Sequence, residues 1–288
     1  MDSSLWSRAE AIADSAKKLG SLQSLETLSE NLQEGNLCFT LRQISSLRRK
    51  KNNSERSDKP RNPFFPYEAP LFVDNAGPAH NILLNKFNVL EQHLLITTKV
   101  FEPQTSELSL ADFHALYECM KQDKALAFYN SGPEAGASQQ HKHLQLVKTA
   151  PAAQDIPFAA IFEQLRDEVP RKLADLPFEH VALGLNNNLF DSEWFTPADA
   201  AAQLKNLYDR LRASLSIEST AGHIEQPYNW LLTQEWMLLV PRRKESYQGV
   251  SLNALAFIGS ILVPDKKQAR QIKSAGLARA LTEVSGLI

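Results

Sequence analysis

The chain has 288 residues, of which 43% are hydrophobic and 22% charged, so it is long enough to bury a sizeable core. Its net charge of -2 argues against a general nucleic-acid coat, which needs an excess of basic residues. No window approaches eighteen consecutive apolar residues, and the N-terminus lacks the basic start and apolar run of a signal peptide. We therefore expect a cytoplasmic protein that binds neither nucleic acid nor membrane.

The first half of the chain predicts one helix followed by strands in neighbouring pairs. Apolar residues at helical spacing predict a helix over residues 5–19, and alternation of apolar and polar residues predicts a strand over 37–44. The basic, proline-punctuated segment 48–66 predicts an irregular loop. Two strands joined by a short polar link are predicted within 80–98, and a capping-box signature at Ser109 predicts the start of a helix.

The second half alternates less regularly between strands and helices. The predicted strands and helices are, in order, a strand over 125–131, a strand over 143–149, a helix over 159–168, a strand near 178–185, a helix over 196–213, a hairpin over 228–242, and helices over 252–262 and 266–285. Strands therefore come in adjacent pairs, which favours an α+β protein with a mainly antiparallel sheet. The two common glycine-rich nucleotide-binding fingerprints are absent from the sequence.

The segment SGPEAGASQQHKHLQLV, residues 131–147, joins a glycine-containing polar loop directly to two histidines and a glutamine at alternate positions. In a strand, His141, His143 and Gln145 lie on one face and the leucines between and after them face the core. Three interpretations are open: a solvent-facing stripe, a metal site that lacks a third ligand, and a nucleophilic histidine. The loop favours the nucleophile, because glycines let backbone N–H groups converge on an anion such as phosphate.

The stretch NSGPEAGASQQHKHLQ resembles the signature of the diadenosine tetraphosphate (Ap4A) phosphorylases, also called ATP adenylyltransferases, a transferase branch of the histidine-triad superfamily. Similar segments follow the same order on either side of it, namely NPFFPYEAPLFV, LLNKFNVLEQHLLIT, YNWLLTQEWMLLVPR and GVSLNALAFIGSILV. The resemblance covers most of residues 35–265. It implies one histidine-triad-like catalytic unit over 1–288, in which 1–170 carries the HxHxQ motif and 175–288 completes the sheet and the substrate site.

The resemblance also implies a role for each residue of the motif. His143 is expected to attack the α-phosphorus of Ap4A, Gln145 to contact the α-phosphate, and His141 to orient the nucleophile through its carbonyl. Inorganic phosphate then takes the AMP, so that Ap4A and phosphate become ADP and ATP. The substrate-binding positions that the resemblance implies are Lys51, Asn85, Lys86, Asn130, Ser131, Gly132, Gly136, Ala137, Ser138, Gln139, Asn229, Thr233, Gln234 and Arg243.

The polyphosphate and the family both imply a divalent cation, Mg²⁺, and the absence of a carboxylate cluster from the sequence suggests that it is carried with the substrate. The expected partners are the small molecules Ap4A, ATP, ADP and phosphate. Nucleotidyl transfer from a UDP-sugar, hydrolysis of dinucleoside polyphosphates, and nucleotide sensing without catalysis are the alternatives. Lys142 stands where uridylyltransferases typically have proline, and Gln145 where the hydrolases have histidine, so both favour the adenylyl branch.

Overall fold

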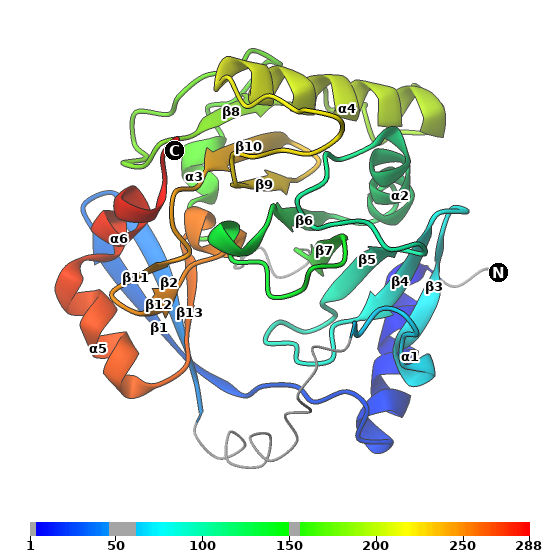
Figure 1. The fold of residues 1–288 in the computed structure, drawn as a ribbon, viewed down its shortest axis with the longest axis horizontal. Helices are drawn as coiled ribbons and strands as arrows, with labels where there is room; N and C mark the ends of the chain where they lie inside the picture. Colours follow the sequence, from blue (N-terminus) through cyan, green and yellow to red (C-terminus); the bar gives the residue numbers. More distant parts are fainter. Residues whose placement is uncertain (1–3, 46–61, 150–155) are drawn as a thin grey trace.

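One eight-stranded sheet runs through the molecule and contains strands from both halves of the chain (Figure 1). The computed structural model describes residues 4–45, 62–149 and 156–288. Every pair of neighbours in the sheet is antiparallel, so the predicted α+β class with a mainly antiparallel sheet is confirmed. Its strands, in spatial order, are β3 (Phe72–Ala76), β4 (His80–Leu84), β5 (Leu94–Thr98), β7 (His143–Lys148), β6 (Ala125–Asn130), β9 (Tyr228–Leu232), β10 (Trp236–Pro241) and β8 (Val181–Gly184).

Three amphipathic helices cover one face of this sheet: α1 (Leu5–Lys18), α2 (Leu110–Met120) and α4 (Pro197–Ser214). Their boundaries follow from local chemistry. Ser109 and Asp112 form the predicted capping box of α2, and Thr196 caps α4 with a proline in the first turn. The helices bury a large apolar core against alternate residues of the strands, including Leu144 and Leu146 of β7.

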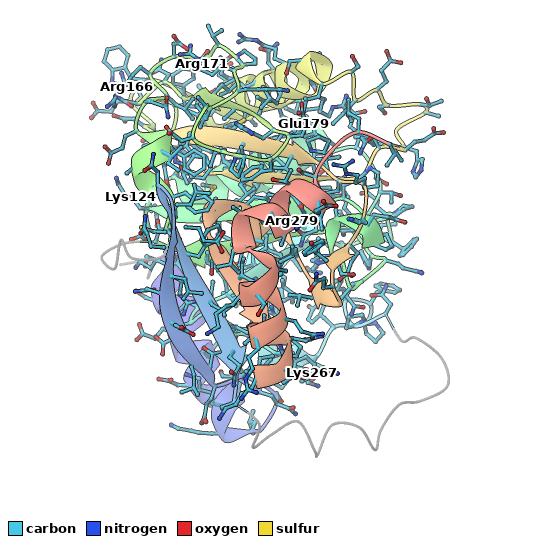
Figure 2. All side chains as sticks on the ribbon, turned by 90° about the vertical axis from the view of Figure 1, so that its left-hand side faces the viewer. Lys124, Arg166, Arg171, Glu179, Lys267 and Arg279 are labelled. Carbon is cyan, nitrogen blue, oxygen red and sulfur yellow. The ribbon has the colours of Figure 1, made fainter. Side chains whose placement is uncertain are left out.

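A smaller sheet and the last two helices pack against the opposite face, over the C-terminal strands. The small sheet contains β1 (Thr27–Glu34), β2 (Leu37–Ile44) and β13 (Ser260–Val263), and the helices are α5 (Lys266–Ala275) and α6 (Leu277–Val284). Figure 2 shows these two helices lying along the paired strands β1 and β2. The Glu34 carboxylate accepts bonds from the N–H groups of Leu277 and Ala278, which caps the free donors at the start of α6.

Several sequence predictions of helices and strands were wrong. The helix predicted over 252–262 is a short 3-10 turn, η4 (Ala254–Ile258), followed by β13, which pairs in parallel with β2. Gly259 separates them with a φ of 92°, and a Cβ there would lie 2.8 Å from the carbonyl oxygen of Cys38. The helix predicted over 266–285 is divided at Gly276, and that over 159–168 is only α3 (Ala159–Phe162). Strand β1 was missed because most of its side chains are exposed and polar.

The remaining elements are short. They are η1 (Ala69–Leu71), η2 (Pro133–Ala135), β11 (Ser246–Tyr247) and β12 (Val250–Ser251). Within the three described ranges, no helix combines the length and the apolar character needed to cross a membrane.

Candidate active site

The HKHLQ motif begins β7 near the middle of the large sheet, and its side chains alternate as predicted. Leu144 and Leu146 point into the helical core. Gln145 lies opposite Leu95 of β5 and Phe128 of β6, on the other face. The sheet thereby presents His143 and Gln145 together on the face opposite α1, α2 and α4.

His143 is held as a neutral, directed imidazole. Its Nδ1 donates a hydrogen bond of 2.8 Å to the carbonyl oxygen of His141. The resemblance of the motif to the family implied this bond. Burial lowers the pKa of His143 to about 4, because the charged ring loses its hydration. Among the described residues no group bonds Nε2. The ring therefore carries its proton on Nδ1 and presents a lone pair on Nε2.

His141 is fixed at both ring nitrogens. Its Nε2 donates to the carbonyl oxygen of Thr98 at 2.9 Å, and its Nδ1 accepts from the side-chain amide of Asn62 at 2.8 Å. Burial lowers its pKa as well. Because the ring is locked, the backbone carbonyl that holds His143 is also locked.

Gln145 ends a directed chain of hydrogen bonds that the sequence did not predict. Asn85 Nδ2 donates to His93 Nδ1 at 3.2 Å, and His93 Nε2 donates to Gln145 Oε1 at 3.0 Å. Burial lowers the pKa of His93 to about 4, so this ring also stays neutral and keeps one donor and one acceptor. With Oε1 occupied, the amide NH₂ of Gln145 remains to donate to a ligand oxygen. His93 lies directly before β5, and its spacing in the sequence did not single it out.

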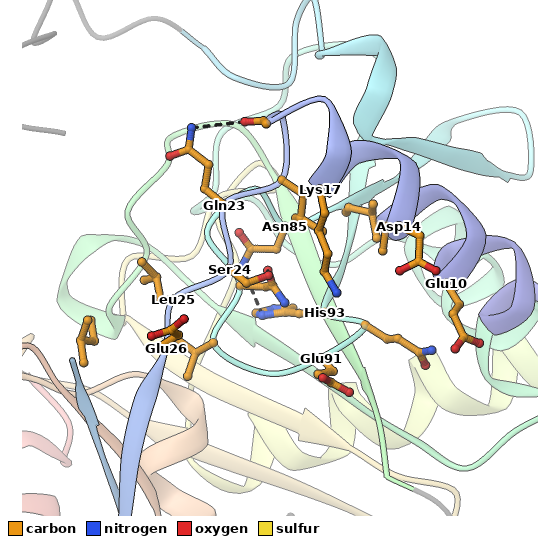
Figure 3. A pocket seen from close by; sticks show the side chains of 18 of the residues that line it. Glu10, Asp14, Lys17, Gln23, Ser24, Leu25, Glu26, Asn85, Glu91 and His93 are labelled. Atoms are coloured by element: carbon orange, nitrogen blue, oxygen red, sulfur yellow. Dashed lines mark hydrogen bonds between the residues drawn. The ribbon is translucent and has the colours of Figure 1, made fainter. Parts of the chain in front are cut away.

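A cavity of about 980 Å³ adjoins the hydrogen-bonded chain of Asn85, His93 and Gln145 and is lined by the first two of these residues (Figure 3). It lies between α1, the segment that follows α1 and the connection from β4 to β5. Figure 3 shows Asp14 and Lys17 of α1 on one side, Ser24 on the other, and Asn85 and His93 between them. Among the expected site residues that the structure describes, Asn85 alone lines the cavity. The cavity and the His143 ring are thus linked through His93 and Gln145.

The polar loop before the motif is a compact turn held by its own backbone. Gly132 and Gly136 both have φ of 88°, and a Cβ on Gly136 would meet the backbone of Asn253 at 3.1 Å. The N–H groups of Gly132, Ala135, Gly136 and Ala137 donate to carbonyls within the loop. These donors are already used within the turn, so the expectation that the glycine amides bind an anion stays a prediction.

Donors do remain in and beside the loop. The backbone N–H groups of Ser138 and Gln139 form no hydrogen bond with the part of the chain that the structure describes. Ser131 Oγ is buried and likewise has no partner in the described ranges. Asn130 accepts bonds at Oδ1 from Asn229 and from the Ala254 N–H, which leaves its NH₂ group as a donor. These donors are the groups available to bind an anion.

Asn229 supports the loop with a side-chain amide that is bonded within the protein, and its contact with a substrate stays a prediction. It is fully buried, and its NH₂ donates to Asn130 Oδ1 and to the Ala135 carbonyl. Its Oδ1 accepts a bond of 2.6 Å from Arg242, whose guanidinium also bonds the carbonyls of Ala135 and Leu252. Arg242, which the sequence did not single out, therefore ties the C-terminal half of the chain to the loop.

The structure does not bring three further C-terminal positions of the predicted site, Thr233, Gln234 and Arg243, beside His143. Because β9 pairs antiparallel with β6, Asn229 lies beside Asn130, and the turn after β9 lies at the far end of the sheet. Thr233 and Gln234 occupy that turn, where Thr233 Oγ1 accepts bonds from the turn and Gln234 bonds the chain between α2 and β6. Arg243 is exposed and donates to the Thr282 carbonyl of α6.

The two lysines expected to bind substrate have different outcomes. Lys86 follows β4 and forms a half-exposed ion pair of 2.6 Å with Glu68, so its ammonium is already partnered. Its contact with a substrate stays a prediction. Lys51 lies outside the described residues.

Lys142, between the two histidines, points to the opposite face and is almost fully buried. Its Nζ lies 2.6 Å from Asp112 Oδ2 and 3.1 Å from Glu102 Oε2, and it also donates to the Glu107 carbonyl. Burial raises the pKa of the Asp112 carboxyl, but the bonds from His80 and Lys142 outweigh it and lower that pKa to about 2. The motif is thereby anchored to the capping residue of α2 from behind.

His180 provides an internal comparison with His143. Its Nδ1 also bonds the carbonyl two residues earlier, that of Phe178, at 2.8 Å. Its Nε2, however, accepts a bond from the Leu173 N–H, so the lone pair is occupied. The same sequence spacing thus produces a structural histidine at one place and an available nucleophile at the other.

The described residues contain no cluster of three or more His, Cys, Asp or Glu side chains placed to hold a metal ion. The interpretation of the HxH spacing as two ligands of a metal site therefore has no third ligand in this part of the chain. His141 and His143 instead use their ring nitrogens and carbonyls in the hydrogen bonds described above.

The antiparallel sheet with an HxHxQ motif on β7 defines a histidine-triad-like protein. Comparison with known proteins places it more narrowly: the chain belongs to the Ap4A phosphorylase family, whose N-terminal domain model matches residues 1–164, while the model of the ATP adenylyltransferase C-terminal domain matches residues 174–286.

Two proteins of Saccharomyces cerevisiae are similar to this chain. Diadenosine 5',5'''-P1,P4-tetraphosphate phosphorylase 2 is 27% identical over 287 residues, covering 89% of this chain and 86% of the relative. Protein APA1 is 28% identical over 214 residues, covering 67% of this chain and 64% of the relative. The crystal structure of yeast Ap4A phosphorylase Apa2 superposes with a TM-score of 0.81 at 24% identity, covering 100% of this chain and 96% of that one. The same protein in complex with Ap4A gives a TM-score of 0.79 at 23% identity, covering 100% and 99%.

Proposed function

We propose that this protein catalyses the phosphorolysis of Ap4A to ADP and ATP, and the reverse reaction, through an adenylyl group carried on His143. One observation carries the proposal: a buried, neutral imidazole whose Nδ1 is bound to the His141 carbonyl and whose Nε2 is available. Membership of the Ap4A phosphorylase family supports the choice of substrate. The complex of yeast Apa2 with Ap4A shows that a protein of this fold binds that dinucleotide.

The reaction proceeds by two displacements at phosphorus. His143 Nε2 attacks the α-phosphorus of Ap4A, the bond to the bridging oxygen breaks, and ATP leaves with the electron pair. Phosphate oxygen then attacks the same phosphorus, the P–N bond breaks, and ADP forms with regeneration of the neutral ring. Gln145 and the donors of Asn130, Ser138 and Gln139 stabilise the charge on the transferred group in both steps.

We place the nucleoside attached to the α-phosphate in the cavity beside α1. Asn85 lines the cavity and is hydrogen-bonded through His93 to Gln145. In this placement the ribose lies near Asn85 and the α-phosphate near Gln145. A divalent cation, Mg²⁺, is proposed to arrive with the polyphosphate and to neutralise part of its charge. A cytoplasmic location, and partners that include neither nucleic acid nor membrane, stay predictions from the sequence.

The test is incubation with Ap4A and Mg²⁺, with and without inorganic phosphate, followed by separation of the nucleotides. Consumption of Ap4A should require phosphate and should yield ADP and ATP in equal amounts. Formation of AMP and ATP without phosphate would identify a hydrolase instead. Turnover of a UDP-sugar but not of Ap4A would identify a uridylyltransferase, and tight binding of Ap4A without any turnover would identify a sensor.

The first displacement should stay fast well into the acid range. Because the pKa of His143 is about 4, the ring remains neutral at pH 5.5, whereas an ordinary histidine with a pKa near 6.5 would be mostly protonated there. We expect the single-turnover rate of enzyme adenylylation, measured without phosphate, to be constant from about pH 8 to 5.5. A halving of this rate near pH 6.5 would contradict the assignment.

The free energy of unfolding should decrease as the pH falls from about 6.5 toward 4. His143 and His93 bind protons near pH 4 in the folded state and near 6.5 when unfolded, so the unfolded state binds more protons between these values. The contribution of both rings to stability is therefore complete above about pH 6.5 and is lost as the pH falls toward 4. Circular dichroism at each pH verifies that the kinetic measurement is made on folded protein.

A further inference from the structure

Strands β6 and β7 separate at the point where the active site begins. Their last paired residues are Phe128 and Gln145, and the same register continued would set Asn130 against His143. The side-chain amide of Gln104 lies there instead. Its Nε2 donates to the Asn130 carbonyl at 2.9 Å, and its Oε1 accepts from the His143 N–H at 2.8 Å. One inserted amide therefore replaces a direct backbone hydrogen bond between the two strands.

The inserted amide is itself held on several sides. Gln104 is only 3% exposed, and its Nε2 makes a second bond of 3.1 Å to the His143 carbonyl. Its backbone N–H donates to the Gln140 carbonyl at 2.8 Å, and its carbonyl accepts from the Tyr129 hydroxyl. The side-chain amide thus has partners on β6 and β7, and the backbone of Gln104 is bonded to Gln140 just before β7 and to Tyr129, so the residue is held on both strands.

We propose that Gln104 is a positioning residue for His143, acting as a spacer that holds β6 and β7 apart. The separation leaves room for the loop of residues 131–142 between the strands, and the bonds to both backbone groups of His143 fix the backbone that carries its ring. Gln104 does not touch substrate and acts only through Asn130 and His143. This inference rests on the proposed function, because the quantity that it controls is the attack of Nε2 on phosphorus.

The chain contains a matched control at the other end of β6. Gln234 also donates from Nε2 to two carbonyls, those of Met120 and Asp123, and accepts at Oε1 from a backbone N–H, that of Ala125. Its three hydrogen bonds reproduce those of Gln104 in kind, but they hold a turn remote from His143. Gln104→Met and Gln234→Met therefore remove equivalent bonds, and only the first alters the site.

The experiment measures single-turnover adenylylation of His143 with Ap4A by mass spectrometry, together with the melting temperature of each variant. Gln104→Met should slow adenylylation about 100-fold, as a misplaced reacting group does, and Gln234→Met less than threefold at a comparable change in melting temperature. Equal slowing in both variants, or none in Gln104→Met, overturns the inference. Absence of adenylylation in the unmodified enzyme would instead refute the proposed function.

Gln104→Glu provides a second test that does not depend on the tolerance of the fold for methionine. The glutamate keeps the acceptor for the His143 N–H, but when ionised it has no donor for the two carbonyls. Burial raises the pKa of such a carboxyl, and its protonated form regains one O–H donor. The adenylylation rate relative to that of the unmodified enzyme should therefore rise as the pH falls from 8 to 5.5. A ratio that does not change with pH contradicts the spacer role.

Discussion

His143→Ala is expected to lower the rate of Ap4A phosphorolysis by about 10⁴-fold or more, because removal of a nucleophile removes the reaction path itself. Binding of Ap4A should remain measurable, since Gln145, Asn130 and the loop donors are still present. Mass spectrometry of the unmodified enzyme, quenched after exposure to Ap4A without phosphate, should find one adenylyl group on the peptide that contains His143. The variant should carry none.

His180→Ala is the matched control, because its ring makes the same Nδ1 bond to a carbonyl two residues earlier. Its Nε2 is occupied by the Leu173 N–H, so its loss removes a buried histidine without removing a nucleophile. We expect the folded His180 variant to retain phosphorolysis within about tenfold and to form the adenylyl enzyme. Retained turnover in His143→Ala would show that another group attacks phosphorus.

Lys142→Met should lower the free energy of unfolding by about 3 kcal/mol, the cost of removing one partner from a buried ion pair. The variant leaves the Asp112 carboxylate buried, with His80 as its remaining side-chain partner from the sheet. Because the side chain points away from His143, the destabilisation arises on the helical side of the sheet. Equilibrium denaturation in urea, with the slope compared between variants, measures it.

Lys148→Met, on the same strand, is the control for this measurement. Lys148 pairs with Asp123 at 3.5 Å, and both side chains are 29% exposed, so solvent screens the interaction. Exposed pairs of this kind contribute about 0–1 kcal/mol, and we expect the variant to fall in that range. If the two variants lose the same stability, the buried charges of Lys142 and Asp112 do not anchor the motif.

The central part of the site was predictable because its determinants are local in sequence. Alternation within a single strand places His143 and Gln145 on one face, and the carbonyl that holds His143 belongs to a residue two positions earlier. The glycines of the preceding loop were also apparent in the sequence. The use of their amides was not predictable, because hydrogen bonds that close a turn compete with a ligand for the same donors.

The C-terminal contribution was not predictable from the sequence alone. Asn229 lies within a clear hairpin signal, but whether it reaches the ligand depends on how β9 is placed against β6. Register between strands a hundred residues apart depends on which faces pack together in the folded chain, and the sequence of either strand alone does not determine it. For the same reason β13, which pairs with β2, was mistaken for a helix.

Sequence by itself determined the class of fold, the strand that carries the histidines and the face on which they lie, because periodicity and local hydrogen bonding act over a few residues. Tertiary structure alone decided which atoms are free to react. Burial makes His143 and His93 neutral, and Gln104 separates β6 from β7. Arg242 and Asn229 form hydrogen bonds with each other and with the loop, whereas their sequence alone is equally compatible with binding a ligand. Each of these outcomes depends on solvent exclusion and on partners distant in the chain, and both exist only once the chain has folded.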